Sequence, residues 1–377
     1  MTDPSIVYLD HAASTPVRPE AVEAMLPYLT ESYGNPSGAH AMARSARNAI
    51  DDVRAVMSEA LGCRPGEIVF TSGGTESDNA AVFGFADRGT VVCSAIEHHA
   101  VLDPVHVRNG RAVAVTADGV IDLDALDDSV DDSVALVSVM LANNEIGTIQ
   151  PLAEVAEIVR SRAPRAVLHT DAVQAFPWLD VASLASTVDL VSISAHKFGG
   201  PKGVGVLVVR DGIDFPARQV GGGQERERRS GTQNVAGIVA MGTAAELTVE
   251  ERKETVDRIE PLRDRLADGL LAAIAGTHES GERARKVAGN CHVCFDGIES
   301  EALLYLLEKA GIMASAASSC ASGAQDPSHV LAAIGLSRSL AGGSLRLSLG
   351  TTTTPGDVDR ALDVLPDAVA RLRALGS

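Results

Sequence analysis

Short apolar runs rich in valine, separated by helical patterns, recur from about residue 66 of this chain. They read EIVFTS, TVVCSA, AVAVTA, VALVSVML, AVLHTDA, DLVSIS and VGVLVVR. Runs of this length that are apolar on both faces are typical of buried parallel strands, and the segments between them supply helical crossovers. We therefore predict an α/β fold with a mainly parallel mixed sheet covered on both faces. Ligands of such sheets bind beyond the carboxyl ends of the strands.

The pattern changes after residue 233. A long helical region over 236–275, with an expected break near its middle, precedes the strand NCHVCFDG, the helix SEALLYLLEKAG, a loop, the helix SHVLAAIG, the strand SLRLSLG and a final helix. This order predicts a smaller α+β domain that closes over the first. We expect a large domain over 16–250 and a small domain formed by 1–15 and 251–377.

The charge balance restricts the partners of the chain. Its 377 residues include 32 basic and 50 acidic side chains, giving a net charge of −18. Nucleic acid or an anionic membrane would be repelled, so we expect neither as a partner. No segment reaches the length of a membrane span, and the N-terminus does not resemble a signal peptide. The five scattered cysteines favour a cytoplasmic protein with free thiols.

Lys197 is the most informative single residue. It follows the run DLVSIS, with His196 before it and the glycine-rich turn FGGPKG after it. Burying an ammonium group is costly, so a lysine at a strand end is either exposed or chemically used. Partial burial lowers the pKa of the amine and makes it a nucleophile toward a carbonyl.

The stretch TSGGTES, residues 71–77, joins a strand to a helix. Its glycines allow a ligand to approach the backbone, and the free N–H groups of a helix start favour a phosphate. A glycine turn before a helix is common, so this signal is weak by itself. A nucleotide-binding module is disfavoured because no lysine follows the glycines as in a P-loop.

Other polar side chains follow other strands. Asp171 ends one run and is either a helix cap or the partner of a protonated ring nitrogen. His98 and His99 follow a second, and we expect His98 alone to lie flat on a ring. Asn143 and Asn144 follow a third, where a turn is the alternative. The phosphate turn, aspartate, histidine and lysine together suit pyridoxal 5'-phosphate (PLP), whose ring acts as an electron sink.

Two further residues stand out near the C-terminus. Cys320 lies in MASAASSCASGAQDPS, a run of small polar residues in which a thiol would contribute little to packing. A thiol on such a loop can attack a substrate and then carry the transferred group to an acceptor. Arg346 lies in an alternating apolar strand and calls for an anion such as a substrate carboxylate.

The pair Cys291 and Cys294 has the spacing of a metal or redox site. Residues i and i+3 of a strand point to opposite faces, and no second Cys/His pair accompanies them. We therefore predict no metal there. Cys63 and Cys93 are expected to be ordinary buried thiols.

Ten motifs occur in the order found in cysteine desulfurases of the NifS/IscS type, class V members of the aminotransferase fold-type I superfamily. From about residue 6 to residue 355 the chain resembles this family. The motifs are YLDHAASTP, YGNPSGAH, IVFTSGGTESDN, EHHAVLD, NNEIGTIQP, HTDAVQA, SAHKFGGPKGVG, GGGQERERRSGT, SSCASG and LRLSLG.

The resemblance implies a role for each matching position. Lys197, Cys320 and His98 would be catalytic: Lys197 would bind PLP covalently, Cys320 would take the sulfur as a persulfide, and His98 would stack on the ring. Asn35 and Arg346 would hold the carboxylate of L-cysteine. The implied cofactor contacts are Gly74, Thr75, His98, Asn144, Asp171, Gln174, Ser194, His196, Lys197 and Thr232.

The implied activity is removal of sulfur from L-cysteine, which yields L-alanine, with transfer to an acceptor such as an iron–sulfur scaffold or a thiolation pathway. A homodimer is implied as well, with Thr232 reaching the PLP phosphate of the other subunit. The alternatives are a selenocysteine lyase or another class V aminotransferase-like enzyme. A sulfur-carrier scaffold without catalysis would bind no cofactor at Lys197.

Overall fold

The valine-rich runs form the predicted central sheet. The computed structural model describes residues 6–316 and 328–376. Seven strands pair in the order β2-β8-β7-β6-β5-β3-β4. The strands of the described residues are β1 (Val7–Tyr8), β2 (Ile68–Thr71), β3 (Thr90–Ser94), β4 (Arg111–Val113), β5 (Val134–Ser138), β6 (Val167–Asp171), β7 (Leu190–Ser194), β8 (Gly205–Val209), β9 (Thr277–Glu279), β10 (Asn290–Phe295), β11 (Ile312–Met313) and β12 (Ser344–Ser348).

Most neighbours in this sheet are parallel, which confirms the prediction. β6 is parallel to β5 and β7, and β3 is parallel to β4 and β5. β8 is antiparallel to both β2 and β7, so the sheet is mixed. Because β2 and β7 both run opposite to β8, the carboxyl ends of β2, β3, β5, β6 and β7 lie along one edge.

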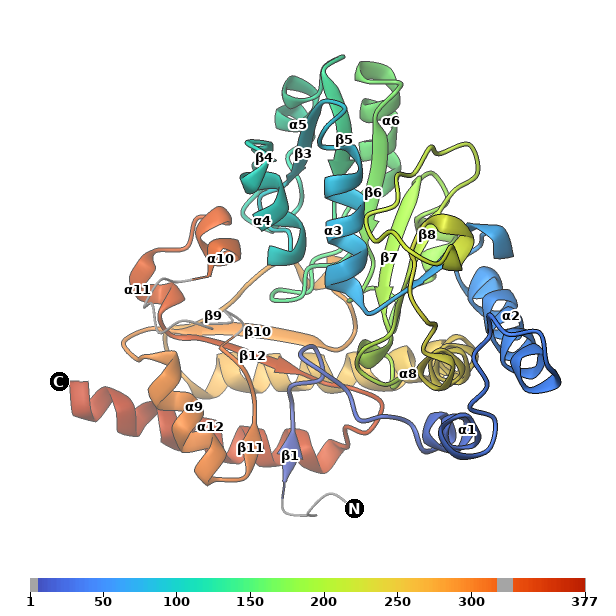
Figure 1. Cartoon of the computed structure of the whole chain (residues 1–377). Helices are drawn as coiled ribbons and strands as arrows, with labels where there is room; N and C mark the ends of the chain where they lie inside the picture. Colours follow the sequence, from blue (N-terminus) through green and yellow to red (C-terminus); the bar gives the residue numbers. More distant parts are fainter. Residues whose placement is uncertain (1–5, 317–327, 377) are drawn as a thin grey trace.

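Both faces of the sheet are covered, because neighbouring residues of a strand pack into different cores. Ile68 and Phe70 of β2 lie in one hydrophobic cluster, whereas Val69 between them lies in another. Figure 1 shows helices in front of and behind the strands. The helices are α1 (Pro19–Thr30), α2 (Ala41–Ala60), α3 (Gly74–Phe85), α4 (His99–Val107), α5 (Leu123–Ser129), α6 (Leu152–Arg162), α7 (Val181–Leu184), α8 (Val235–Ala273), α9 (Ser300–Lys309), α10 (His329–Ala333), α11 (Arg338–Ala341) and α12 (Pro355–Gly376).

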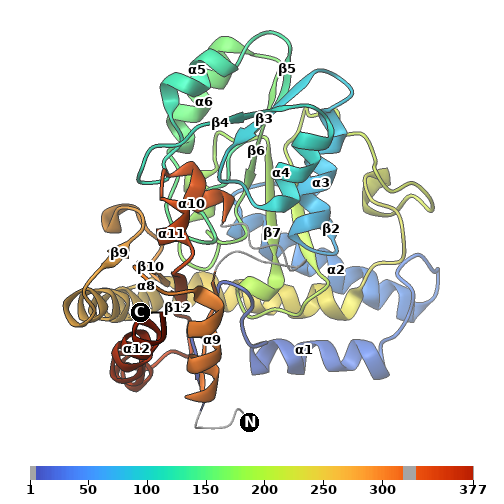
Figure 2. The ribbon, with the colours of Figure 1, turned by 90° about the vertical axis from the view of Figure 1, so that its left-hand side faces the viewer.

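The expected break in the long helical region is wrong. α8 runs without interruption over 39 residues and contains Pro261. Proline costs a helix one backbone hydrogen bond. Here packing at both ends outweighs that cost: Ile238 and Met241 lie in the core under the sheet, whereas Ile259 and Leu266 lie in the C-terminal core. α8 therefore extends through both parts of the molecule, with the central sheet above it and α12 below it in Figure 1 (see also Figure 2).

The C-terminal core contains the predicted strand and helix pattern. β10 lies between β12 and β9 in an antiparallel sheet. α9 and α12 cover it, and Leu9 from the N-terminal segment packs into the same cluster. The division at 15/16 and 250/251 stays a prediction.

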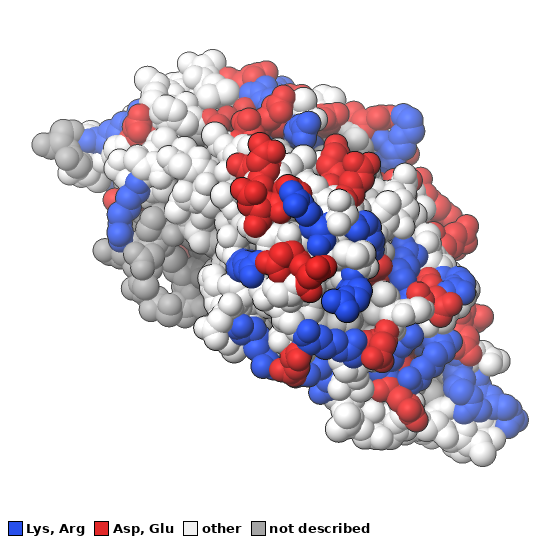
Figure 3. Space-filling model, turned by 90° about the horizontal axis from the view of Figure 1, so that it is seen from above, with Lys and Arg blue, Asp and Glu red and all other residues white. Residues whose placement is uncertain are grey.

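Charges of both signs are mixed on the molecular surface. Basic and acidic side chains are interspersed over the face shown in Figure 3. Within residues 6–316 and 328–376, no helix has an apolar stretch long enough for a membrane span.

Candidate active site

The predicted site residues converge at the edge where the parallel strands end. Asp171 is the last residue of β6 and Ser194 the last of β7. Gly74 begins α3 directly after the turn that follows β2, and His98 caps the N-terminus of α4 after β3. The topology, rather than closeness in sequence, brings these residues together.

Lys197 lies in a short 3-10 helix, Ala195–Lys197, that follows β7. Its Nζ donates to the carbonyls of Ala12, at 2.5 Å, and Ala13, at 2.9 Å. Burial and the charge of Arg346 lower the pKa of Lys197 to about 8, although Asp171 opposes the shift. About a tenth of the amine is therefore uncharged at pH 7, far more than for a lysine with an ordinary pKa.

Asp171 is buried, and its Oδ1 accepts a hydrogen bond from the backbone N–H of Val173 at 2.8 Å. Burial raises the pKa of Asp171 to about 6, while the backbone hydrogen bond and Lys197 counteract part of this effect. The carboxyl group is thus ionised at neutral pH. It is ready to pair with a cationic ring nitrogen.

A layer of buried polar groups lies behind Asp171. His169 of β6 bonds to Ser138 through Nδ1 and to Ser192 through Nε2. Burial lowers the pKa of His169 to about 3, so the ring is neutral. Burial raises the pKa of both Asp78 and Glu97 well above the usual range. The sequence did not reveal this layer, because its members lie on three strands, on α3 and in the segment before α4.

His98 is exposed. Its Nδ1 accepts a hydrogen bond from the backbone N–H of Ala100 at 3.1 Å, which leaves the proton on Nε2. The protein packed around the rest of the ring, together with Lys197, lowers the pKa of His98 to about 4. A neutral imidazole with a free face is suited to stack on a flat ligand. His99 instead bonds to Asp103 on the surface.

The glycine turn before α3 has the shape of a cradle for an anion. Gly73 has φ +147°, and a Cβ on Gly74 would lie 2.9 Å from Val173. The side chain of Ser194 lies beside both glycines, whereas Thr75 is exposed. The turn therefore needs residues without a side chain.

Three other predicted residues border this region. The Nε2 of Gln174 donates to the Ala12 carbonyl at 2.6 Å, next to Lys197. His196 is half-buried, and its Nδ1 lies 3.4 Å from the hydroxyl of Ser14. Asn144 forms part of the turn after β5 and accepts from Arg346 through its carbonyl.

Arg346 of β12 is buried at the same edge. Its Nη2 donates to Asp10 and its Nη1 to the Asn144 carbonyl, both at 2.9 Å, while its Nε has no partner among the described residues. The pairing with Asp10 was not foreseen, although Asp10 lies in the motif YLDHAASTP. Asn35 is exposed. Its Oδ1 accepts from the backbone N–H of Ser37 in an Asx turn, and its carbonyl accepts from the N–H of Gly38.

Cys320 lies outside the described residues, but the residues that flank its segment can be placed. The backbone of Ser315 pairs with Arg346. On the other side, Ser328 donates to the carboxylate of Glu145, next to Asn144. Both described ends of this segment are thus attached to the Lys197 edge.

The other four cysteines lie away from the edge that contains Lys197. Cys291 and Cys294 pack on opposite faces of β10, in different hydrophobic clusters. Burial raises the pKa of Cys291 to about 12 and that of Cys294 to about 11. Cys93 is buried, whereas Cys63 is only half-buried.

A strained loop over 219–233 carries the exposed Thr232. Glu225, Arg226 and Glu227 all have positive φ angles, an unusual run for residues other than glycine. The buried carboxylate of Glu225 holds the loop, because it accepts from both Nη atoms of Arg54 and from the backbone N–H of Phe70. This anchor was not predicted, since Arg54 is 171 residues distant in sequence.

Comparisons with known proteins agree with the geometry. The sequence matches the class-V aminotransferase family over residues 7–361. The chain belongs to this family. It is 46% identical to cysteine desulfurase IscS of Methanosarcina thermophila, over 99% of this chain and 94% of that protein. It is 45% identical to an IscS-like cysteine desulfurase of Mycobacterium tuberculosis, over 98% and 97%.

Solved structures place the chain in the same part of the family. A NifS-like protein superposes with a TM-score of 0.91 at 37% identity, covering 97% of this chain and all of that one. SspA in complex with cysteine superposes with a TM-score of 0.78 at 31% identity, covering 91% and 98%. The motifs had predicted this NifS/IscS branch.

Proposed function

We propose that this protein is a PLP-dependent cysteine desulfurase, which takes sulfur from L-cysteine, releases L-alanine and leaves a persulfide on Cys320. The observation that carries the proposal is the attachment of both flanks of the Cys320 segment to the edge that contains Lys197. An aminotransferase would have no use for a thiol there.

The residues at this edge fit PLP. The glycine cradle with Ser194 and His196 suits its phosphate, Asp171 suits its ring nitrogen, and His98 suits its ring face. Thr75, Asn144 and Gln174 complete the set of proposed contacts. When bound, PLP supplies an aldehyde for amines and a ring that accepts electrons from the substrate Cα.

Lys197 acts as the general base and acid at the substrate Cα. With a pKa lowered to about 8, its amine takes a proton from the substrate Cα and later returns one. The carbonyls of Ala12 and Ala13 hold the amine in place.

Arg346 binds the substrate carboxylate. Two of its N–H groups are already used by Asp10 and Asn144, which fix the plane of the guanidinium group. Its Nε keeps a free N–H for the carboxylate, and Asn35 is the second proposed contact.

Cys320 receives the sulfur. Its thiolate attacks the Sγ of the substrate, so that an S–S bond forms while the substrate Cβ–Sγ bond breaks. The electron pair of the broken bond stays with the substrate carbon, which takes up a proton to give alanine. The persulfide then passes to an acceptor protein, such as an iron–sulfur scaffold, in the cytoplasm.

We further propose a homodimer in which Thr232 of one subunit reaches the phosphate of the other. The exposed position of Thr232 on the loop held by Glu225 supports this arrangement. Sedimentation of wild-type protein at half the expected dimer mass would contradict it.

The direct test compares Cys320→Ala with Cys63→Ala, a matched loss of a thiol on the half-buried Cys63. With L-cysteine and a reductant, we expect Cys320→Ala to lose both sulfide and alanine and Cys63→Ala to keep both. Alanine formation without Cys320 would favour a different reaction, such as selenocysteine cleavage.

A further inference from the structure

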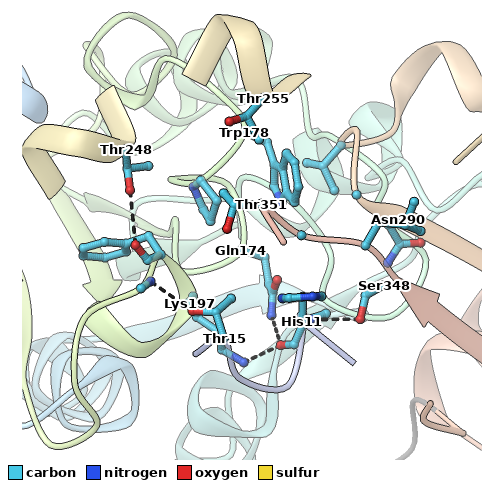
Figure 4. Close-up of a pocket in the computed structure, with 18 of the residues that line it drawn as sticks. His11, Thr15, Gln174, Trp178, Lys197, Thr248, Thr255, Asn290, Ser348 and Thr351 are labelled. Carbon is cyan, nitrogen blue, oxygen red and sulfur yellow. Dashed lines mark hydrogen bonds between the residues drawn. The ribbon is translucent and has the colours of Figure 1, made fainter. Parts of the chain in front are cut away.

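A cavity lies next to the proposed cofactor site and shares Lys197 and Gln174 with it (Figure 4). It is lined by the N-terminal segment, the turn after Gln174, α8 and the 287–290 and 348–351 segments. Lys197 and Gln174 border it, whereas Gly74, His98 and Asp171 do not. It lies where the two main hydrophobic cores meet, since Trp178 packs against both.

Buried polar atoms without a partner are concentrated in its lining. Ten such side-chain atoms occur among residues 6–316 and 328–376, and five of them belong to this cavity. They are both ring nitrogens of His11, Oδ1 of Asn290, and Nε and Nη2 of Arg252. His11 and Asn290 are only 4% and 3% exposed. Polar groups that are buried so deeply without a partner are rare, and their concentration at one cavity points to a ligand.

The lining is also cationic. It contains Arg18, Lys197 and Arg252 but no aspartate or glutamate, in a chain whose net charge is −18. Arg18 is paired with Glu251 at 2.8 Å, and Lys197 is held by backbone carbonyls. Arg252 has neither a hydrogen bond nor an ion pair with any residue that the structure describes, and its guanidinium group lies over the ring of Phe176 at 5.5 Å. Burial lowers the pKa of Arg252, and the charge of Asp180 opposes this shift without forming an ion pair, so the direct partner that Arg252 lacks is an anion.

The rest of the lining restricts the shape of that anion. Trp178, Val287 and Leu349 give it apolar walls. A guanidinium group matches the planar geometry of a carboxylate, and apolar walls favour a ligand with an apolar body. We propose that this cavity binds a small monocarboxylate with a flat apolar body, whose carboxylate pairs with Arg252 and whose body lies against Trp178.

Trp178 is the only tryptophan of the chain, so all tryptophan fluorescence comes from a residue that lines this cavity. The PLP-loaded protein is titrated with benzoate and, separately, with the uncharged benzamide. We expect a saturable change in fluorescence with benzoate only. Saturating L-alanine, added to fill the proposed substrate site, leaves the benzoate affinity unchanged if the two sites are separate.

Two variants test the role of charge. Arg252→Met is expected to weaken benzoate binding about ten- to a hundredfold, the usual effect of losing a hydrogen bond to a charged group. The matched control is Lys253→Met on the same helix, because Lys253 points to solvent and pairs with Asp257. It should bind like the wild type.

A third variant covers the case in which Arg252→Met does not fold. Thr255→Phe fills the cavity from α8 while Arg252 is retained, and it should also weaken binding. The proposal is overturned if benzoate gives no saturable change, if benzamide binds as well, if L-alanine competes, or if the folded Arg252 and Thr255 variants bind benzoate like the wild type. None of these outcomes depends on desulfurase activity.

Discussion

Of the five arginines that lie over phenylalanine rings in the described chain, Arg54 and Arg252 differ most usefully in what else surrounds them. The guanidinium carbon of Arg54 is 4.7 Å from the centre of the Phe70 ring, and that of Arg252 is 5.5 Å from the Phe176 ring. Arg54 is paired with the buried carboxylate of Glu225, whereas Arg252 forms no ion pair in the described chain and is influenced by the charge of Asp180 without direct contact. Arg54, which holds the 219–233 loop, therefore has an ion-pair partner, whereas Arg252, which lines the cavity, has none among the described residues.

At the edge that contains Lys197, the charges are only partly compensated, which is intermediate between Arg54 and Arg252. Arg346 is balanced by Asp10, and Lys197 is influenced by Asp171, yet the Nε of Arg346 has no partner among the described residues and the pKa of Lys197 is lowered. Partial balance is suited to groups that must bind a substrate and then release a product.

The largest effect is expected for Lys197→Ala, which separates the two neighbouring sites. Loss of the amine should reduce alanine formation from cysteine by at least about two orders of magnitude, the usual contribution of a positioned acid–base group. Benzoate binding at Trp178 should persist. If both are lost in a folded variant, the edge and the cavity are one site.

The balanced pair is tested by Glu225→Gln. An uncompensated Arg54 would remain buried, which typically costs about 3–5 kcal/mol. Urea denaturation should show this loss, and Arg54→Met combined with Glu225→Leu should recover part of it. Unchanged stability of the single variant would mean that this pair does not anchor the loop.

The pH dependence of cofactor capture tests the state of Lys197. Only the uncharged amine attacks the PLP aldehyde, so in cofactor-free protein the capture rate should rise about tenfold per pH unit below a pKa of about 8 and then level off. The rise of absorbance after mixing with PLP gives this rate. A midpoint above 10 would mean that burial does not lower the pKa of Lys197.

The smallest effect is expected for the stability of Arg252→Met. Its charge is partly buried without a partner, so its removal should change the free energy of unfolding by less than about 1 kcal/mol, or raise it. A loss like that of Glu225→Gln would show that Arg252 has a structural role.

Many residues of the candidate site were predictable, because apolar runs in the sequence show where each strand ends. The positions of Lys197, Asp171 and Gly74 follow from apolar runs and from glycine, and topology then brings them together. The partners of Arg346 and Arg54 were not predictable, because Asp10 and Glu225 are 336 and 171 residues away. The continuity of α8 also escaped prediction, since it depends on packing at both ends.

The central claim is that Lys197 and Cys320 act together on cysteine. Mass spectrometry of peptides from protein exposed to L-cysteine tests it most directly. We predict one added sulfur on Cys320 in the wild type and none in Lys197→Ala. Added sulfur on Cys320 of the Lys197 variant, or only on Cys63 in the wild type, would contradict the account.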